Sequence, residues 1–395
     1  MSRLRIAASV AKVYSMFRIS ILLLSAISLF AQTTSSPRNI LNDSSKFPIA
    51  VWLQNPKNAA RFKAAGVNLY VGLYRGPTAE QLATLAKSEM PVICGQTARS
   101  LAFKDNPLIV AWMHDDEPDN AQALPDRKGW GPPVLPAVIQ EDYKKMLAAD
   151  PTRPVFLNLG QGVAWDNWIG RGVRRNKPED YPEYVKGGDI VSFDIYPAVH
   201  DEKEVAGKLE FVAKGVERLR NWAGPNRKVW NCIEAARISN VDVKPTVDQI
   251  RSEVWMSIIQ GSQGIVYFVH QFKPTFSEAS LLEDSELLAG VTALNAQVQE
   301  LAPVINSATV GSKVTTSENS LKVATLPKEY RGTNYLFTVG MENRAAEVSF
   351  QFPELLKIAN VELIGEARSV RVESGEFRDH FKPYEVHLYR FKAAK

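Results

Sequence analysis

Residues 108–118, LIVAWMHDDEP, form a short apolar run that ends in three consecutive acids and a proline. Residues 228–234, KVWNCIE, repeat this design with an apolar run that ends in a glutamate. Nearly continuous apolar runs of this kind are typical of strands buried on both faces, as in a parallel sheet. Both runs therefore place an acid at the carboxyl end of a predicted buried strand.

Six further apolar runs accompany these two. They cover residues 47–53, 67–74, 91–96, 154–159, 189–197 and 264–270. Helical patterns lie between most of them, over residues 55–65, 78–87, 137–149, 201–222, 246–260 and 285–301, whereas the link between the third and fourth runs is short on helix. Eight alternating strands and helices predict an α/β fold, a (β/α)8 TIM barrel, with 108–118 as its fourth strand and 228–234 as its seventh.

The pattern changes after about Pro303. Short runs with a period of two follow at 320–324, 335–339, 346–350 and 384–389, and turn residues separate them. This alternation predicts a small antiparallel β-sandwich. We therefore expect a catalytic barrel over residues 32–302 and a C-terminal β-sandwich domain over residues 303–395.

The N-terminus has the composition of an export signal. A basic segment is followed by an apolar stretch at 19–30 that is too short to span a bilayer comfortably, and then by polar residues. Residues 1–31 are predicted to be a signal peptide, with Met16 as a second possible start and an uncleaved anchor as the alternative. The expected location is the periplasm or the medium, with no stable membrane partner after cleavage.

Composition narrows the class of partner. The 395 residues are 45% hydrophobic and 23% charged with a net charge of +4, and no basic run interleaved with aromatic residues is present, so no nucleic-acid partner is expected. Cys94 and Cys232 fall on the third and seventh predicted strands, too far apart around a barrel for a disulfide. The oligomeric state stays open.

Glu117 and Glu234 are the candidate catalytic residues. Barrel enzymes hold their catalytic groups at the carboxyl ends of the strands, where both glutamates are predicted to lie. Two facing carboxylates, one proton donor and one nucleophile or base, are the minimum equipment for cleaving a glycosidic bond. The alternatives are an acidic helix start for Glu117 and, for Glu234, a structural carboxylate paired with an arginine such as Arg237.

Residues 111–119, AWMHDDEPD, resemble the acid/base segment of retaining glycoside hydrolases of clan A, and residues 229–234 resemble their nucleophile strand. Residues 260–268 are similar to the entry into strand eight of β-galactosidase-like members, and the tail resembles the all-β domain that often follows such barrels. The resemblance implies that Glu117 is the acid/base and Glu234 the nucleophile of a retaining double displacement without a cofactor. Many members have asparagine in place of Asp116, and that asparagine holds the sugar 2-hydroxyl, so the resemblance implies that Asp116 accepts a hydrogen bond from the same hydroxyl.

Further side chains at strand ends are suited to hold a carbohydrate by stacking or by hydrogen bonds. The predicted substrate-binding residues are Trp52, Tyr74, Gln96, Asp116, Asn158, Tyr196 and His270, and Tyr196 is expected to hydrogen-bond the nucleophile. Trp165 and Trp168 belong to one of two long insertions, 119–136 and 160–182, that we expect on the catalytic face. Packing within the barrel is the alternative for each aromatic residue.

Two other functions compete with the hydrolase. One is a catalytically inactive carbohydrate-binding barrel that uses the same cleft. The other is a metal-dependent hydrolase with ligands from His114, Asp115, His200 and His270, although the first strand offers Trp52 and Gln54 where that class needs a paired histidine motif. We therefore expect no metal and no cofactor, and the sugar, its linkage and the choice between exo and endo cleavage stay open.

Overall fold

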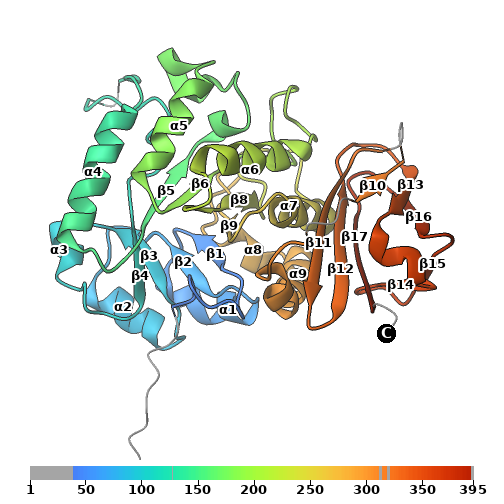
Figure 1. Ribbon diagram of the computed structural model, residues 1–395. Coiled ribbons are helices and arrows are strands. Elements are labelled where there is room, and N and C mark those ends of the chain that lie inside the picture. Colours follow the sequence, from blue (N-terminus) through green and yellow to red (C-terminus); the bar gives the residue numbers. More distant parts are fainter. Residues whose placement is uncertain (1–38, 127, 311–313, 318–320, 393–395) are drawn as a thin grey trace, which may run out of the picture. The chain divides into compact units, whose positions relative to one another are not determined.

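The computed structural model describes residues 39–126, 128–310, 314–317 and 321–392 (Figure 1). The signal peptide predicted at 1–31 lies outside the described residues. Within them, no helix is both long and apolar enough to cross a membrane.

All eight predicted barrel strands are present. They are β1 (Ile49–Trp52), β2 (Leu69–Val71), β3 (Val92–Gly95), β4 (Ile109–Met113), β5 (Val155–Leu159), β6 (Ile190–Phe193), β7 (Lys228–Val229) with β8 (Asn231–Glu234), and β9 (Ile265–Phe268). Only Trp230 separates β7 from β8, so these are two halves of the predicted seventh strand. Because β7 pairs with β6, β8 pairs with β9 and β9 pairs with β1, the parallel sheet closes into a barrel.

Helices follow most strands, as the sequence predicts. The longer ones are α1 (Ala59–Ala64), α2 (Ala79–Ala86), α4 (Pro136–Ala149), α6 (Glu210–Ala223), α7 (Val247–Ile259) and α9 (Ser285–Ile305). Short segments are η1 (Pro56–Asn58), α3 (Ala98–Leu101), η2 (Gln161–Val163), η3 (Ile169–Arg174), η4 (Pro178–Asp180), α5 (Tyr181–Tyr184), η5 (Val185–Gly187) and α8 (Ser280–Glu283). The link between the third and fourth strands has only the single turn of α3. Thr78 and Thr246 cap α2 and α7 by accepting from the third backbone N–H of each helix.

The sixth barrel helix begins later than predicted. The pattern over 201–222 suggested a helix from Asp201, but α6 starts at Glu210, and turns occupy the preceding residues. Gly207 there has a φ of +73°, in the left-handed region, which ends any helix that would run through it. The turns leave residues 198–206 beside the carboxyl end of β6.

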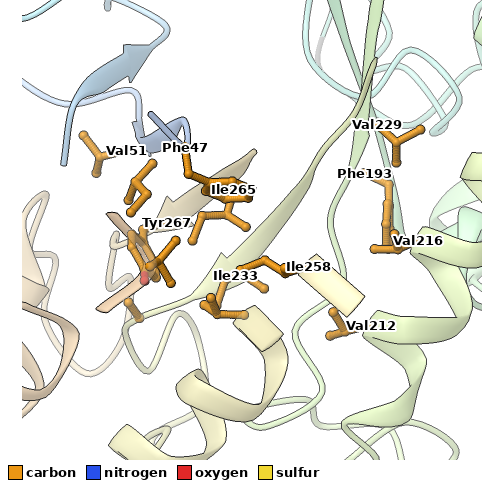
Figure 2. Close-up of a cluster of buried hydrophobic side chains, with 14 of the residues drawn as sticks. Phe47, Val51, Phe193, Val212, Val216, Val229, Ile233, Ile258, Ile265 and Tyr267 are labelled. Atoms are coloured by element: carbon orange, nitrogen blue, oxygen red, sulfur yellow. The ribbon is translucent and has the colours of Figure 1, made fainter. Parts of the chain in front are cut away.

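Alternate residues of the strands face two different cores. Outward-facing strand residues such as Val229 and Phe193 belong to one buried cluster with Val212 and Val216 of α6, and Figure 2 shows Phe193 beside Val216. A Cβ on Gly215 would lie 2.2 Å from the Phe193 ring, so only glycine lets α6 approach β6 this closely. Inward-facing side chains fill the barrel interior and include Ala50, Leu69, Ile93, Ala111, Phe156, Trp230, Cys232 and Val266. Both cysteines are free and buried.

The tail forms two antiparallel sheets. One has the order β10-β13-β16 and the other β11-β12-β17-β14-β15. Their bounds are β10 (Thr315–Thr316), β11 (Val323–Tyr330), β12 (Thr333–Gly340), β13 (Ala346–Gln351), β14 (Asn360–Leu363), β15 (Ser369–Arg371), β16 (Glu376–Phe381) and β17 (Val386–Lys392), with η6 at Pro353–Lys357. A separate apolar core fills this domain, which confirms the fold predicted for the tail.

The β domain packs on the barrel helices. Figure 1 shows α7 and α9 beside β11 and β12. The ring of Trp255 on α7 lies 5.1 Å from that of Phe337 on β12, and the Tyr384 hydroxyl donates to Glu210 of α6. Helix α9 continues through Pro303, so the boundary predicted at 302/303 falls in the last turn of this helix.

Candidate active site

A cleft of about 770 Å³ opens at the carboxyl ends of the barrel strands. Most of its lining residues come from the ends of seven strand segments and from the loop after β9, and η1 and α2 contribute one residue each. The lining residues are Trp52, Leu53, Gln54, Asn55, Pro56, Tyr74, Gln81, Asp116, Glu117, Asn158, Asp194, Tyr196, Cys232, Phe268, His270, Phe272, Phe276 and Glu278. Seven of these side chains are aromatic, and the acids Asp116, Glu117 and Asp194 lie together.

Glu117 lines this cleft just after β4. Its φ of 45° lies in the left-handed region, which is costly for a residue with a side chain and is common at functional sites. Burial raises the pKa of Glu117 well above its usual value, and the negative charge of Asp194 and a hydrogen bond with that carboxylate raise it further. A side-chain hydrogen bond from Asn120 opposes the rise. Burial and the neighbouring Asp194 charge thus favour the protonated form of Glu117.

Asp194, directly after β6, is the partner of Glu117. Only 9% of Asp194 is exposed, and burial raises its pKa to about 7, although hydrogen bonds from Glu117 and from the Tyr196 hydroxyl favour its charged form. In this pair Glu117 holds the proton and Asp194 holds the negative charge. Asp194 was not among the predicted site residues, although an acid that ends the strand-like run VSFD at 191–194 is the same signal that singled out Glu117 and Glu234.

Asp116 and Asn158 lie beside the pair. The Asn158 amide donates to Asp116 over 3.0 Å, and its oxygen lies 3.8 Å from the Cys232 sulfur. Burial among protein atoms and the charge of Glu117 raise the pKa of Asp116, while solvent in the cleft still reaches its side chain and weakens that effect. The cleft therefore offers three neighbouring carboxyls and an amide.

Glu234 does not line the cleft, which differs from its expected position. Its side chain is fully buried, accepts a hydrogen bond from the Ala198 backbone over 2.6 Å, and faces Glu253 of α7, which is also fully buried. Burial raises the pKa of both carboxyls. The seventh strand presents Cys232 to the cleft instead, and Tyr196 hydrogen-bonds Asp194 rather than Glu234. The structure thus places the predicted nucleophile inside the protein, next to the barrel helix.

Most of the other predicted binding residues are brought together. Trp52, Tyr74 and His270 line the cleft, and Tyr74 is 67% exposed at its mouth. His270 stacks on Phe272 with ring centroids 6.2 Å apart. Gln96 is the exception, because its amide donates to the backbone oxygen of Met146 at the end of α4 and does not line the cleft. The role expected for Gln96 in substrate binding is therefore not supported.

The residues of the competing metal site lie apart. His114 bonds the Gly187 backbone oxygen over 2.8 Å, and His200 bonds the Gln161 side chain over 2.8 Å, outside the cleft that His270 lines. No group of three or more His, Cys, Asp or Glu side chains among the described residues is arranged to hold a metal ion.

The two insertions meet at the catalytic face. Asp119, fully buried, accepts from the Gly160 backbone and from the Tyr181 hydroxyl, each over 2.9 Å. The buried guanidinium of Arg171 donates to the Asp119 backbone oxygen and to Asp180. A Cβ on Gly160 would lie 2.9 Å from Glu117 Oε1 and 2.7 Å from the Asn120 amide nitrogen. Any larger residue at this position would therefore displace the side chains of Glu117 and Asn120.

Comparison with known proteins supports the fold. The chain matches no family model and no curated protein. A GH42 beta-galactosidase from G. stearothermophilus superposes with a TM-score of 0.59 at 8% identity, over 89% of this chain and 99% of that chain. AmyP in complex with maltose gives 0.55 at 8% over 90% and 99%, and alpha-galactosidase I from Mortierella vinacea gives 0.55 at 9% over 91% and 100%. These similarities confirm a TIM barrel followed by a C-terminal β domain.

Proposed function

We propose that this protein is a glycoside hydrolase that cleaves O-glycosidic bonds of oligo- or polysaccharides with retention of configuration. Glu117 is the proton donor and Asp194 the nucleophile. The observation that carries the proposal is the Glu117–Asp194 pair, one carboxyl protonated and the other charged, in a cleft with aromatic walls. Solved proteins of the same fold include a beta-galactosidase, an alpha-galactosidase and a maltose complex, which supports a carbohydrate substrate.

The chemistry follows from the protonation states. When a glycoside binds, its leaving oxygen replaces Asp194 as the acceptor of the Glu117 proton. Asp194 attacks the anomeric carbon, the bond from that carbon to the leaving oxygen breaks, and the Glu117 proton passes to the leaving oxygen. The Glu117 carboxylate then takes a proton from water, whose oxygen attacks the anomeric carbon and releases Asp194.

The short separation of the pair favours retention. Retaining enzymes hold their carboxyls about 5–5.5 Å apart, whereas inverting enzymes leave about 6.5–9.5 Å for a water molecule. Glu117 and Asp194 are within hydrogen-bonding reach of each other before substrate enters. A bound sugar has to separate them, and a small separation brings them to the shorter distance that retaining enzymes use. The Tyr196 hydroxyl holds the nucleophile through its hydrogen bond to Asp194.

The test is a screen of the purified protein against plant and bacterial polysaccharides, with products identified by chromatography and their anomeric configuration followed by proton NMR. We expect the first-formed product to keep the configuration of the substrate. We also expect Asp194→Ala to lose turnover and to regain part of it with azide, giving a glycosyl azide of inverted configuration. Full activity of Asp194→Ala would refute the assignment, and saccharide binding without turnover would indicate the inactive carbohydrate-binding barrel.

We also propose that the protein is exported, with residues 1–31 as the signal peptide. N-terminal sequencing of the protein recovered from the producing cells tests this proposal. A mature N-terminus near Gln32 would support it, and an intact leader would contradict it.

A further inference from the structure

A second pocket, of about 340 Å³, adjoins the cleft and shares Tyr196 with it. It lies over the loops that follow β5, β6 and β8. Its lining residues are Gln161, Trp168, Tyr196, Val199, His200, Asp201, Glu202, Ile238, Ser239 and Asn240. None of the catalytic carboxyls lines this pocket, so chemistry takes place in the cleft and the pocket can hold a different part of the substrate.

Hydrogen bonds link the proton donor Glu117 in the cleft to the second pocket. The Trp168 indole N–H donates to Asn120 Oδ1 over 2.9 Å, and the Asn120 side chain hydrogen-bonds the Glu117 carboxyl. A general acid stands beside the leaving oxygen, so the departing group extends toward the side on which the acid is held. Trp168 lines the pocket and is the far end of this series of hydrogen bonds from Glu117. The pocket therefore lies on the leaving-group side of Glu117.

The pocket wall has the chemistry of a sugar site. Trp168 packs against Trp165 with centroids 5.8 Å apart, and Trp165 packs edge-on against His200 at 5.5 Å. His200 Nδ1 accepts from the Glu202 backbone N–H over 3.0 Å, so its other nitrogen donates to Gln161 and the ring is neutral. Trp168 and His200 line the pocket, and Trp165, which does not line it, packs against both rings.

The charged residues that line the pocket restrict the kind of sugar that it can bind. Asp201 and Glu202 are exposed at the pocket, where their carboxylates can accept hydrogen bonds from hydroxyl groups. No lysine or arginine is among the residues described as lining it. Neutral sugars therefore fit, whereas the carboxylate of a uronic acid would be repelled.

We propose that this pocket is a subsite for the leaving-group sugar, so that the substrate is a neutral oligo- or polysaccharide that spans the cleft and the pocket across Tyr196. The inference rests on the proposed function for its assignment of Glu117 as proton donor. It adds that the enzyme recognises a sugar on both sides of the bond that it cleaves.

The test compares two substrates that share one glycone. Maltotriose, cellotriose, xylotriose and β-1,4-galactotriose are each paired with the glycosyl fluoride of the same sugar, whose leaving group needs no pocket. Ser239→Trp fills the pocket from an exposed loop position, and Val241→Trp adds the same bulk two residues away, where the side chain is exposed and outside the pocket. We expect Ser239→Trp to lower the ratio of kcat/KM for trisaccharide over fluoride at least tenfold and Val241→Trp to leave it unchanged.

An unchanged ratio in Ser239→Trp, with both substrates hydrolysed, would overturn the subsite and leave the proposed function standing. If the wild-type protein hydrolyses no pair, the proposed function fails, and calorimetric titration with the same trisaccharides decides the subsite. Binding that is lost in Ser239→Trp and kept in Val241→Trp would support it. Equal binding to all three proteins, or binding to none, would overturn it.

Discussion

Replacing Glu234 with glutamine separates a structural from a catalytic role for the acid at the end of the seventh strand. Burial raises the pKa of Glu234 from 4.5 to about 7 in the folded protein. Each pH unit between these values costs the folded state about 1.4 kcal/mol, because the unfolded chain ionises first. Over about 2.5 units the penalty is about 3 kcal/mol at pH 7 and above. The folded state carries no such penalty below pH 4.5, and this part of its stability is lost as the pH rises through 7.

Glutamine removes this penalty, since it cannot ionise and keeps the oxygen that accepts from Ala198. We expect Glu234→Gln to raise the free energy of unfolding by up to about 3 kcal/mol at pH 8 and to change it little at pH 4.5. Urea titrations followed by tryptophan fluorescence at both pH values measure the difference. Glu300→Gln, on the exposed side of α9, is the matched control and should show no such pH dependence.

The same variant tests the catalytic assignment. We expect Glu234→Gln to keep its turnover, because its carboxyl does not reach the cleft. A correctly folded Glu234→Gln without activity would refute this reasoning and restore Glu234 as the nucleophile. A variant that gains no stability at pH 8 would show that the carboxyl ionises freely in the folded protein.

Four further predictions concern the proton donor, the pH dependence, the surroundings of the donor and the tail. Glu117→Gln should lose about a hundredfold or more in kcat on glycosides with poor leaving groups and much less on glycosyl fluorides, and equal losses would argue against a proton donor. In the wild-type protein kcat/KM should rise with pH as Asp194 ionises near pH 7 and fall where Glu117 loses its proton, whereas an acid limb near pH 4 would contradict the raised pKa of Asp194. Gly160→Ala should lower kcat about tenfold or more by displacing Glu117 while the melting temperature changes little, since the backbone of Gly160 suits alanine. Ending the chain at Asn306 should lower solubility and melting temperature by uncovering Trp255; a soluble, equally stable but inactive barrel would instead assign the tail a role in the site.

The barrel could be predicted because its signal is carried by every repeat. A strand buried on both faces needs an apolar run, and closure needs eight of them, so errors at single boundaries such as the start of α6 do not change the fold. The split of the seventh strand at Trp230 left no mark in the sequence, because Trp230 itself is as apolar as the residues of an unbroken buried strand. The tail was predictable for the same reason, since alternation over several short runs repeats one signal.

The site was harder to predict because a strand end points its side chains to two sides. Glu117 and Asp194 turn into the cleft, whereas Glu234 turns toward α7, and one residue of register separates these outcomes. The backbone of Glu117 has a positive φ, which no local pattern in DDEP predicts. Gln96 shows the same limit, since its amide caps the end of α4 instead of reaching a substrate. An acid at a strand end therefore identifies the face of the barrel on which catalysis occurs, but only the local twist of the chain decides which acids meet. Glu117 follows β4 and Asp194 follows β6, and β5, which carries Asn158, lies between these two strands. The catalytic pair therefore comes from strands two positions apart, close enough to share one proton without a water between them.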